Sequence, residues 1–333
     1  MIRRKLGFIA AVAMVVASAI SSQAFAEDLQ KVRVRLDWKG GGQHAPFYLA
    51  KQNGFYKDEG IDLEIISGSG SSDVVKQVGA GAIEFGLADA LVLTQAAQQR
   101  VPLKAVAAYY LRTPIAVISP KAKPITQPSQ LTGGIKLGSK KGSATFQGLI
   151  ALLSANNIPL EQVKLVDIGF GVAPLVVGQV DALMGFTTSE TVEAENAGMQ
   201  INVMPISEFG VDVYGLTIVG NSSLIEKKPE LVKAFLRATH KGMALATKDP
   251  AAAIEAVVKQ VEAADGPLQS KILARATPFW TGPDSAGHEL GWQSAARWQS
   301  TIDTAQKLGL IDRPVTPDEL FSNAFLDSSS KSQ

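Results

Sequence analysis

Short apolar segments alternate with helix-forming segments up to about Asp212. A parallel α/β architecture requires this order, because a helix carries the chain back across the sheet between successive strands. The pattern therefore predicts a doubly wound α/β fold. We expect strands at residues 32–37, 61–67, 85–88, 103–108, 115–119, 135–138, 163–167, 182–185 and 216–219. We expect helices between them at residues 46–53, 73–78, 90–99, 145–156 and 188–197.

After Asn221 the pattern changes to helices alone, several of which open with proline, whose missing N–H costs nothing at that position. They are expected at residues 229–247, 250–261, 268–276, 288–307 and 317–321. A helical tail of this kind is expected to pack back onto an earlier domain. A chain of this length usually divides into two lobes. The strands near Ile115 and Leu216 lack clear helical crossovers, so we expect the chain to pass between lobes there. Lobe 1 then comprises residues 27–116 with 215–333, and lobe 2 comprises residues 117–214.

The N-terminus resembles a cleavable export signal, predicted at residues 1–26 with cleavage after Ala26. Arg3, Arg4 and Lys5 precede an apolar run at residues 6–20, and small residues follow it. The run is shorter than the roughly 20 residues of a spanning helix, so the mature chain is expected to be soluble, with an uncleaved anchor as the alternative. The whole chain has 32 basic and 31 acidic residues, and without the signal it has 29 and 31. No nucleic-acid partner is indicated.

The composition excludes several kinds of chemistry. The chain contains no cysteine, which excludes disulfides, thiolate catalysis and cysteine-bound metal. Its three histidines, His44, His240 and His288, have no metal-binding spacing, and the latter two are expected to be surface or capping residues. No P-loop, dinucleotide fingerprint or G-x-S-x-G nucleophile elbow is present. We therefore expect no metal, no cofactor and no nucleophile.

A carboxylate, an indole and an imidazole follow the first predicted strand: Asp37, Trp38 and His44. Open α/β sheets bind ligands beyond the carboxyl ends of their strands. An aromatic wall beside a fixed carboxylate holds a planar, hydrogen-bonding heterocycle by stacking and by a directional acceptor. Alternatively, Asp37 caps the next helix and Trp38 belongs to the core. We favour a ligand-binding role for both residues.

Two turns rich in glycine and serine also connect a strand to a helix. One contains Gly70, Ser71 and Ser72, and the other contains Gly142, Ser143 and Thr145. Such turns can hold the polar end of a ligand with free N–H groups, or they can serve only as helix caps. Further candidates for ligand contact are Asp89, Arg112, Phe186, Glu190 and Tyr214. Arg112 and Glu190 would each orient a ligand if they faced the cleft, and otherwise they are ordinary surface charges.

Five segments carry a resemblance to a known family: Asp37-Trp38, residues 46–64, residues 79–89, residues 229–236 with Asp249-Pro250, and residues 298–312. Here the chain resembles the periplasmic solute-binding proteins that include thiamine-pyrimidine, nitrate, taurine and sulfonate binders, together with the fungal thiamine-pyrimidine synthases. The resemblance implies a periplasmic-binding-protein type II fold, with two lobes around a cleft and the helical tail on lobe 1. It also implies a monomer in the periplasm that delivers a solute to the permease and ATPase of an ABC importer.

Leu36-Asp37-Trp38 and His44 look most like the branch that binds the pyrimidine precursor of thiamine. That resemblance implies that Asp37 and Trp38 contact the ligand, with His44 behind them and Glu190 reaching from the second lobe. The departure from this branch is Lys39-Gly40-Gly41-Gly42, where it usually carries proline and asparagine. A small anion is the alternative ligand, resting on the two turns and Arg112. Asp37 would repel such an anion if it faces the pocket.

A synthase activity is the enzymatic alternative. By that resemblance, the enzymes of the synthase branch carry a lysine at the position after Gly86-Leu87 and a histidine four residues later. This chain has Ala88 and Val92 at these positions. We therefore expect a binding protein rather than an enzyme. A sensory protein that hands its bound state to a membrane receptor stays open, because the same two lobes serve both roles.

Overall fold

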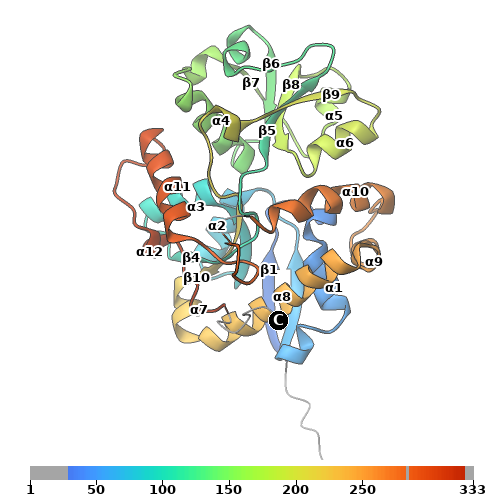
Figure 1. Ribbon diagram of the computed structural model, residues 1–333, viewed down its shortest axis with the longest axis vertical. Coiled ribbons are helices and arrows are strands. Elements are labelled where there is room, and N and C mark those ends of the chain that lie inside the picture. Colours follow the sequence, from blue (N-terminus) through green and yellow to red (C-terminus); the bar gives the residue numbers. More distant parts are fainter. Residues whose placement is uncertain (1–28, 283–284, 327–333) are drawn as a thin grey trace, which may run out of the picture.

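The computed structural model describes residues 29–282 and 285–326, so the predicted signal peptide lies outside the described residues. Two five-stranded sheets, each covered by helices, form two parts of the molecule (Figure 1). We call the part around the first sheet the first lobe and the part around the second sheet the second lobe. The predicted α/β class is confirmed. The exact lobe boundaries stay a prediction.

The first sheet has the strand order β2 (Ile61–Ile66), β1 (Gln30–Arg35), β3 (Phe85–Asp89), β10 (Leu216–Asn221) and β4 (Leu103–Ala108). The second has the order β7 (Lys164–Asp167), β6 (Lys136–Ser139), β8 (Ala182–Phe186), β5 (Ile115–Pro120) and β9 (Ile201–Pro205). In each sheet one strand runs antiparallel to both its neighbours, β10 in the first and β5 in the second. Both sheets are therefore mixed rather than wholly parallel. The physical reason is that no α-helix returns the chain directly before β5 or β10, the two strands expected to lack helical crossovers.

The β9 strand was not predicted, because its five residues include Asn202 and end at Pro205, which weakens the apolar pattern. It pairs with β5 alone and forms the edge of the second sheet.

Helices of the α/β part begin where polar side chains cap them. They are α1 (Ala45–Gln52), α2 (Ser71–Gly79), α3 (Ala90–Gln98), α4 (Ala144–Ala155), α5 (Ala173–Val176) and α6 (Glu190–Asn196). Asp89 Oδ1 accepts from the Leu91 N–H at the start of α3, and Ser143 Oγ accepts from the Phe146 N–H at the start of α4. A short 3-10 helix, η1 (Gly42–His44), precedes α1.

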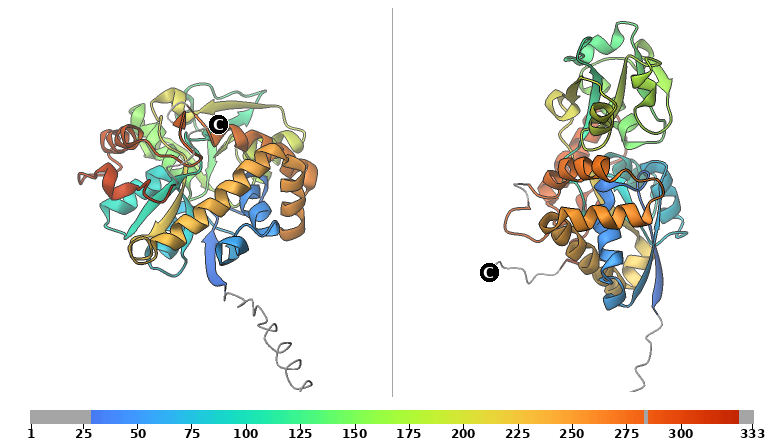
Figure 2. Two further views of the ribbon diagram at one scale, coloured as in Figure 1. Left: turned by 60° about the horizontal axis from the view of Figure 1, so that its bottom comes forward. Right: turned by 90° about the vertical axis from the view of Figure 1, so that its right-hand side faces the viewer.

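The helical tail comprises α7 (Ser222–Lys227), α8 (Pro229–Lys248), α9 (Pro250–Gln260), α10 (Gly266–Ala276), α11 (Ala295–Lys307) and α12 (Pro317–Leu320). Helices α8 and α9 pack against α1 on the first lobe, and α10 lies between the lobes (Figures 1 and 2). The helix predicted at residues 288–307 begins only at Ala295, where Ser294 caps it. His288 therefore starts no helix, and its ring stacks on Trp292. Among the described helices, none is long and apolar enough to cross a bilayer.

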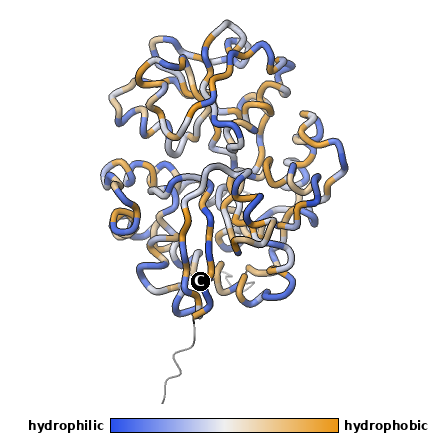
Figure 3. The backbone as a smooth tube through the Cα atoms, turned by 180° about the vertical axis from the view of Figure 1, so that it is seen from behind, coloured by the Kyte–Doolittle hydropathy of each residue, from blue (hydrophilic) through white to orange (hydrophobic). Residues whose placement is uncertain are grey.

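The core of the first lobe is aromatic at its centre. The Phe235 ring of α8 stacks on the Phe85 ring of β3 with centroids 4.1 Å apart. Hydrophobic segments run through both lobes, whereas hydrophilic residues gather on the outer turns (Figure 3). His240 is half-buried, and its ring points inward, contrary to its expected surface position. Its Nε2 is buried with no partner among the described residues, and burial lowers its pKa to about 4.

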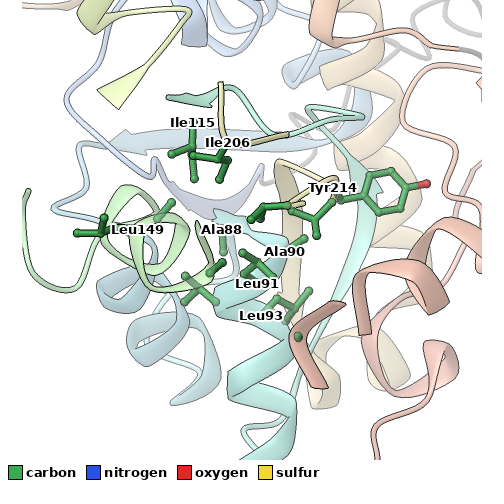
Figure 4. Packing of buried hydrophobic residues seen from close by; sticks show 14 of the residues in the cluster. Ala88, Ala90, Leu91, Leu93, Ile115, Leu149, Ile206 and Tyr214 are labelled. Atoms are coloured by element: carbon green, nitrogen blue, oxygen red, sulfur yellow. The ribbon is translucent and has the colours of Figure 1, made fainter. Parts of the chain in front are cut away.

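The two lobes share a buried apolar cluster on one side of the molecule. Residues of α3 such as Ala90 and Leu91 belong to one cluster with Ile115, Leu149 and Ile206 of the second lobe (Figure 4). This side holds the lobes together, because apolar surface buried there is removed from water. The pocket described next borders this cluster, because Ala144 and Met184 belong to both.

Candidate ligand-binding site

A pocket lies between the lobes and is lined from both sides. The volume of the pocket that is not filled by protein atoms is about 620 Å³, including the part that is open to solvent. The structure brings eight of the predicted site residues to its wall: Asp37, Trp38, Gly70, Ser71, Ser143, Thr145, Phe186 and Glu190. They come from the carboxyl ends of strands or from the turns that follow them, which is where an open α/β sheet binds ligands.

Asp37 and His44 form the back of the first-lobe wall. Asp37 is 7% exposed and lines the pocket, and its Oδ1 lies 2.9 Å from His44 Nε2. His44 is fully buried, and its Nδ1 has no partner among the described residues. His44 therefore lies behind Asp37 and orients the carboxylate, because one of the two carboxylate oxygens is tied to the imidazole.

Glu190 forms the facing part of the second-lobe wall. Its Oε2 accepts from the Ser189 hydroxyl at 2.6 Å and from the Phe186 backbone N–H at 2.9 Å. Burial raises the pKa of this carboxyl, the hydrogen bonds oppose that shift, and the charge of Asp37 adds to it. Two carboxyl groups thus face one pocket, which makes the pocket rich in hydrogen-bond acceptors.

The two glycine- and serine-rich turns contact each other across the boundary. The Ser72 N–H at the start of α2 donates to the Gly142 carbonyl oxygen at 3.3 Å. Gly70 has a φ of +130°, and a Cβ at this position would lie 2.8 Å from the same oxygen. Ser143 donates to the Lys140 carbonyl oxygen and lies 2.8 Å from Thr145 Oγ1. The Ser72 N–H at the N-terminus of α2 is therefore already hydrogen-bonded to a carbonyl oxygen of the second lobe and is not free to bind a ligand.

An aromatic contact closes the mouth of the pocket. The ring of Phe170, in the loop after β7, meets the ring of Trp38 edge to face, with centroids 4.3 Å apart at an angle of 62°. The Nζ atoms of Lys39 and Lys140 lie 4.6 and 5.1 Å from the Phe170 centroid. The sequence analysis missed this loop, although Gly169-Phe170-Gly171 follows a predicted strand in the same way as the two turns above. It also missed Gln43 and Lys140 as pocket residues.

Six predicted residues do not line the pocket. His44 lies behind Asp37, and Ser72 and Gly142 bond to each other beside the pocket, as described above, whereas the other three point elsewhere. Arg112 is exposed and stacks on the Phe279 ring at 4.5 Å. Tyr214 is fully buried in the core, and its hydroxyl accepts from the Ser294 N–H at 2.8 Å (Figure 4). Asp89 is buried below the pocket as the cap of α3, and burial raises its pKa to about 8. Strand-end position alone could not tell which way these side chains point.

Metal ligands are not gathered in the described part of the chain: it holds no group of three or more histidine, cysteine, aspartate or glutamate side chains suited to a metal ion. What the pocket can offer a ligand is an indole ring, two carboxyl groups, several hydroxyls and the ammonium group of Lys140. This arrangement suits binding through stacking and hydrogen bonds.

The two sheets, the helical tail and the pocket between the lobes define a periplasmic-binding-protein fold. A solved structure with this arrangement is the alkanesulfonate-binding protein SsuA of Xanthomonas axonopodis pv. citri bound to MOPS. It superposes with a TM-score of 0.68 at 14% identity, over 88% of this chain and 98% of that one. The sequence model described as NMT1/THI5 like matches residues 42–253, and the chain belongs to that family.

Curated relatives of the chain include binding proteins and enzymes. The riboflavin-binding protein RibY of Chloroflexus aurantiacus is 28% identical over 91% of this chain and 88% of its own length. The formylaminopyrimidine-binding protein of Halalkalibacterium halodurans is 26% identical over 89% and 91%. A 4-amino-5-hydroxymethyl-2-methylpyrimidine phosphate synthase of Legionella pneumophila is 27% identical over 89% and 92%. Family membership therefore fits solute binding and leaves the ligand to be argued from the pocket.

Proposed function

We propose that this protein is the periplasmic substrate-binding component of an ABC importer and that it captures a small, flat, amino-bearing nitrogen heterocycle such as a thiamine-precursor pyrimidine. The observation that carries the proposal is the convergence of Asp37, Trp38 and Glu190 on one pocket between the lobes. The protein would be exported through the segment at residues 1–26, act as a monomer and deliver its ligand to the permease and ATPase of the importer.

The ligand would bind in three steps. Its ring stacks on the Trp38 indole, which supplies apolar contact over the whole flat face. Its amino group donates to Asp37, whose carboxylate is held by His44. The second lobe then closes and brings Glu190 to another edge of the ring. The two connections between the lobes, residues 109–114 and 210–215, would act as the hinge.

A small anion is the less favoured ligand. Two carboxyl groups face the pocket, and like charges in a poorly hydrated site repel one another. The Ser72 N–H already donates to the Gly142 carbonyl oxygen, and Arg112 lies outside the pocket. The donors that these features leave for a sulfonate or a nitrate are the hydroxyls of the pocket wall and Lys140, whose Nζ lies over the Phe170 ring. A synthase activity is also disfavoured, because the positions that the resemblance assigns to its lysine and histidine are the buried, apolar Ala88 and Val92.

The proposal is tested first by native mass spectrometry of gently purified protein, in which a co-purified mass identifies the ligand. Isothermal titration calorimetry then compares 4-aminopyrimidine, riboflavin, taurine and nitrate. Riboflavin is included because a relative is named for it. We expect the aminopyrimidine to bind and the two anions not to bind. Tighter binding of taurine or nitrate than of the pyrimidine would contradict the proposal.

The variant Asp37→Asn tests the site itself. It keeps the shape of the side chain but removes the charge that accepts from the amino group. We expect the dissociation constant for 4-aminopyrimidine to rise by about tenfold, since a hydrogen bond to a charged group contributes about 1.5–3 kcal/mol. The matched control is Asp303→Asn on the outer face of α11, which should change nothing. An unchanged affinity in Asp37→Asn would remove Asp37 from the site.

A further inference from the structure

The side chain of Gln43 is a buried polar group of the pocket wall whose amide oxygen has no hydrogen-bond partner among the described residues. Gln43 is 8% exposed and lines the pocket beside Asp37 and Trp38. A buried acceptor without a partner costs free energy, and in native proteins such a group usually meets water, an ion or a ligand. The position of Gln43 points to a ligand.

The backbone around Gln43 is held firmly, whereas its side-chain oxygen has no hydrogen-bond partner in the part of the chain that the structure describes. Its carbonyl oxygen accepts from the Tyr109 hydroxyl at 2.6 Å. The neighbouring Gly42 N–H donates to Oε1 of Gln269, in α10, also at 2.6 Å. The main chain of η1 is therefore fixed between the core and the helical tail. The side chain of Gln43 extends from this fixed backbone, and its amide oxygen lies next to Gly41, where a Cβ would stand 2.8 Å from it.

The glycine run at residues 40–42 is what permits this placement. A Cβ on Gly42 would overlap the carbonyl oxygen of Gln269, and a Cβ on Gly40 would overlap the Tyr48 hydroxyl. Only glycine at position 42 allows η1 to lie this close to the backbone of α10. The segment in which this chain departs from the pyrimidine-binding branch is thus the segment that sets the position of Gln43.

We propose that Gln43 is a specificity-determining residue whose amide oxygen accepts from a second N–H donor of the ligand, beside the donor taken by Asp37. The inference rests on the proposed function and deepens it. The ligand then belongs to the heterocycles that carry two amino or ring N–H donors on neighbouring edges. A ring with a single donor would leave the Gln43 oxygen buried and unpaired.

The test compares two probes that differ in one amino group, 2,4-diaminopyrimidine and 4-aminopyrimidine, by calorimetry on the full mature protein. We expect the wild type to bind the diamino probe about tenfold more tightly, because the second amino group satisfies the buried acceptor. The variant Gln43→Met has a similar shape and no acceptor. It should lose this preference and bind both probes within about threefold of each other.

The variant Gln43→Glu keeps an acceptor at the same place and should keep the preference, which guards against a variant that is merely misfolded. Melting temperatures of both variants are measured alongside. Two results would contradict the inference: equal weakening of both probes in Gln43→Met, or no preference in the wild type. Gln43 would then not bind a second donor of the ligand, while the proposed function would stand. If the wild type binds neither probe, the proposed function fails as well.

Discussion

Removing the aromatic ring that closes the mouth of the pocket tests whether contact between the lobes controls ligand release. In Phe170→Ala the edge-to-face contact with Trp38 is lost, together with the contacts of Lys39 and Lys140 with the same ring. Phe170 lies in a loop of the second lobe and Trp38 in the first. Trp38 and Lys39 belong to the first lobe, so their two contacts with Phe170 exist only when the lobes are together, whereas Lys140 lies in the same lobe as Phe170 and keeps its contact on opening.

The magnitude follows from these contacts. An edge-to-face pair contributes about 1 kcal/mol beyond buried area, and each cation–π contact at an exposed rim contributes about 0.5 kcal/mol. Only the contacts with Trp38 and Lys39 cross between the lobes, so the closed form would lose about 1.5 kcal/mol relative to the open form, which shifts the balance between the two about tenfold. Since a ligand enclosed between the lobes leaves only after opening, its dissociation rate should rise by about the same factor while association changes little.

Stopped-flow displacement of the bound ligand measures the dissociation rate, and small-angle X-ray scattering of the ligand-free protein measures its opening. The conservative variant Phe170→Tyr keeps the ring and should behave as the wild type. Val177→Ala changes an exposed side chain of the same lobe and serves as a surface control. A dissociation rate in Phe170→Ala within twofold of the wild type, with unchanged scattering, would refute the reasoning.

Two further substitutions test side chains outside the pocket. Burial raises the pKa of Asp89 to about 8 in the folded chain, whereas the unfolded chain releases this proton near pH 4. The free energy of unfolding should therefore fall as the pH rises between these two values. Asp89→Asn should make that fall shallower by about 1 kcal/mol per pH unit, measured by urea denaturation from pH 5 to pH 7, and parallel curves would contradict the buried proton. Arg112→Ala should leave calorimetric affinities for 4-aminopyrimidine and taurine unchanged, because Arg112 stacks on Phe279 away from the pocket. A loss of affinity for either probe would show that Arg112 takes part in ligand binding.

Much of the secondary structure could be predicted because it depends on local patterns. The alternation of β1 and the caps at Asp89 and Ser143 are properties of a few neighbouring residues, and they place strands and helix starts within a residue or two. The failures have the same origin. The edge strand β9 carries a weak pattern, and the turns at residues 288–294 include apolar residues that resemble the start of a helix.

The candidate site was only partly predictable. Strand-end position was enough to suggest Asp37, Trp38 and Glu190, because in an α/β sheet the carboxyl ends of the strands face the ligand. It could not separate them from Tyr214, which has the same kind of position but turns into the core, where its hydroxyl meets the Ser294 N–H. Side-chain direction at a strand end depends on what packs there, and Ser294 is distant in sequence.

The sequence by itself determined the α/β class, the order of most strands and helices and the likeness to two-lobed binding proteins, since each of these is encoded in local periodicity and short motifs. Only the tertiary structure decided which groups meet. Trp38 contacts Phe170, Ser72 contacts Gly142, and Gly42 lies against Gln269, and in every pair the partners are far apart along the chain. Such contacts depend on how whole lobes and helices pack. For that reason the need for glycine at residues 40–42, where this sequence differs from the pyrimidine-binding branch, becomes clear only from the close approach of α10.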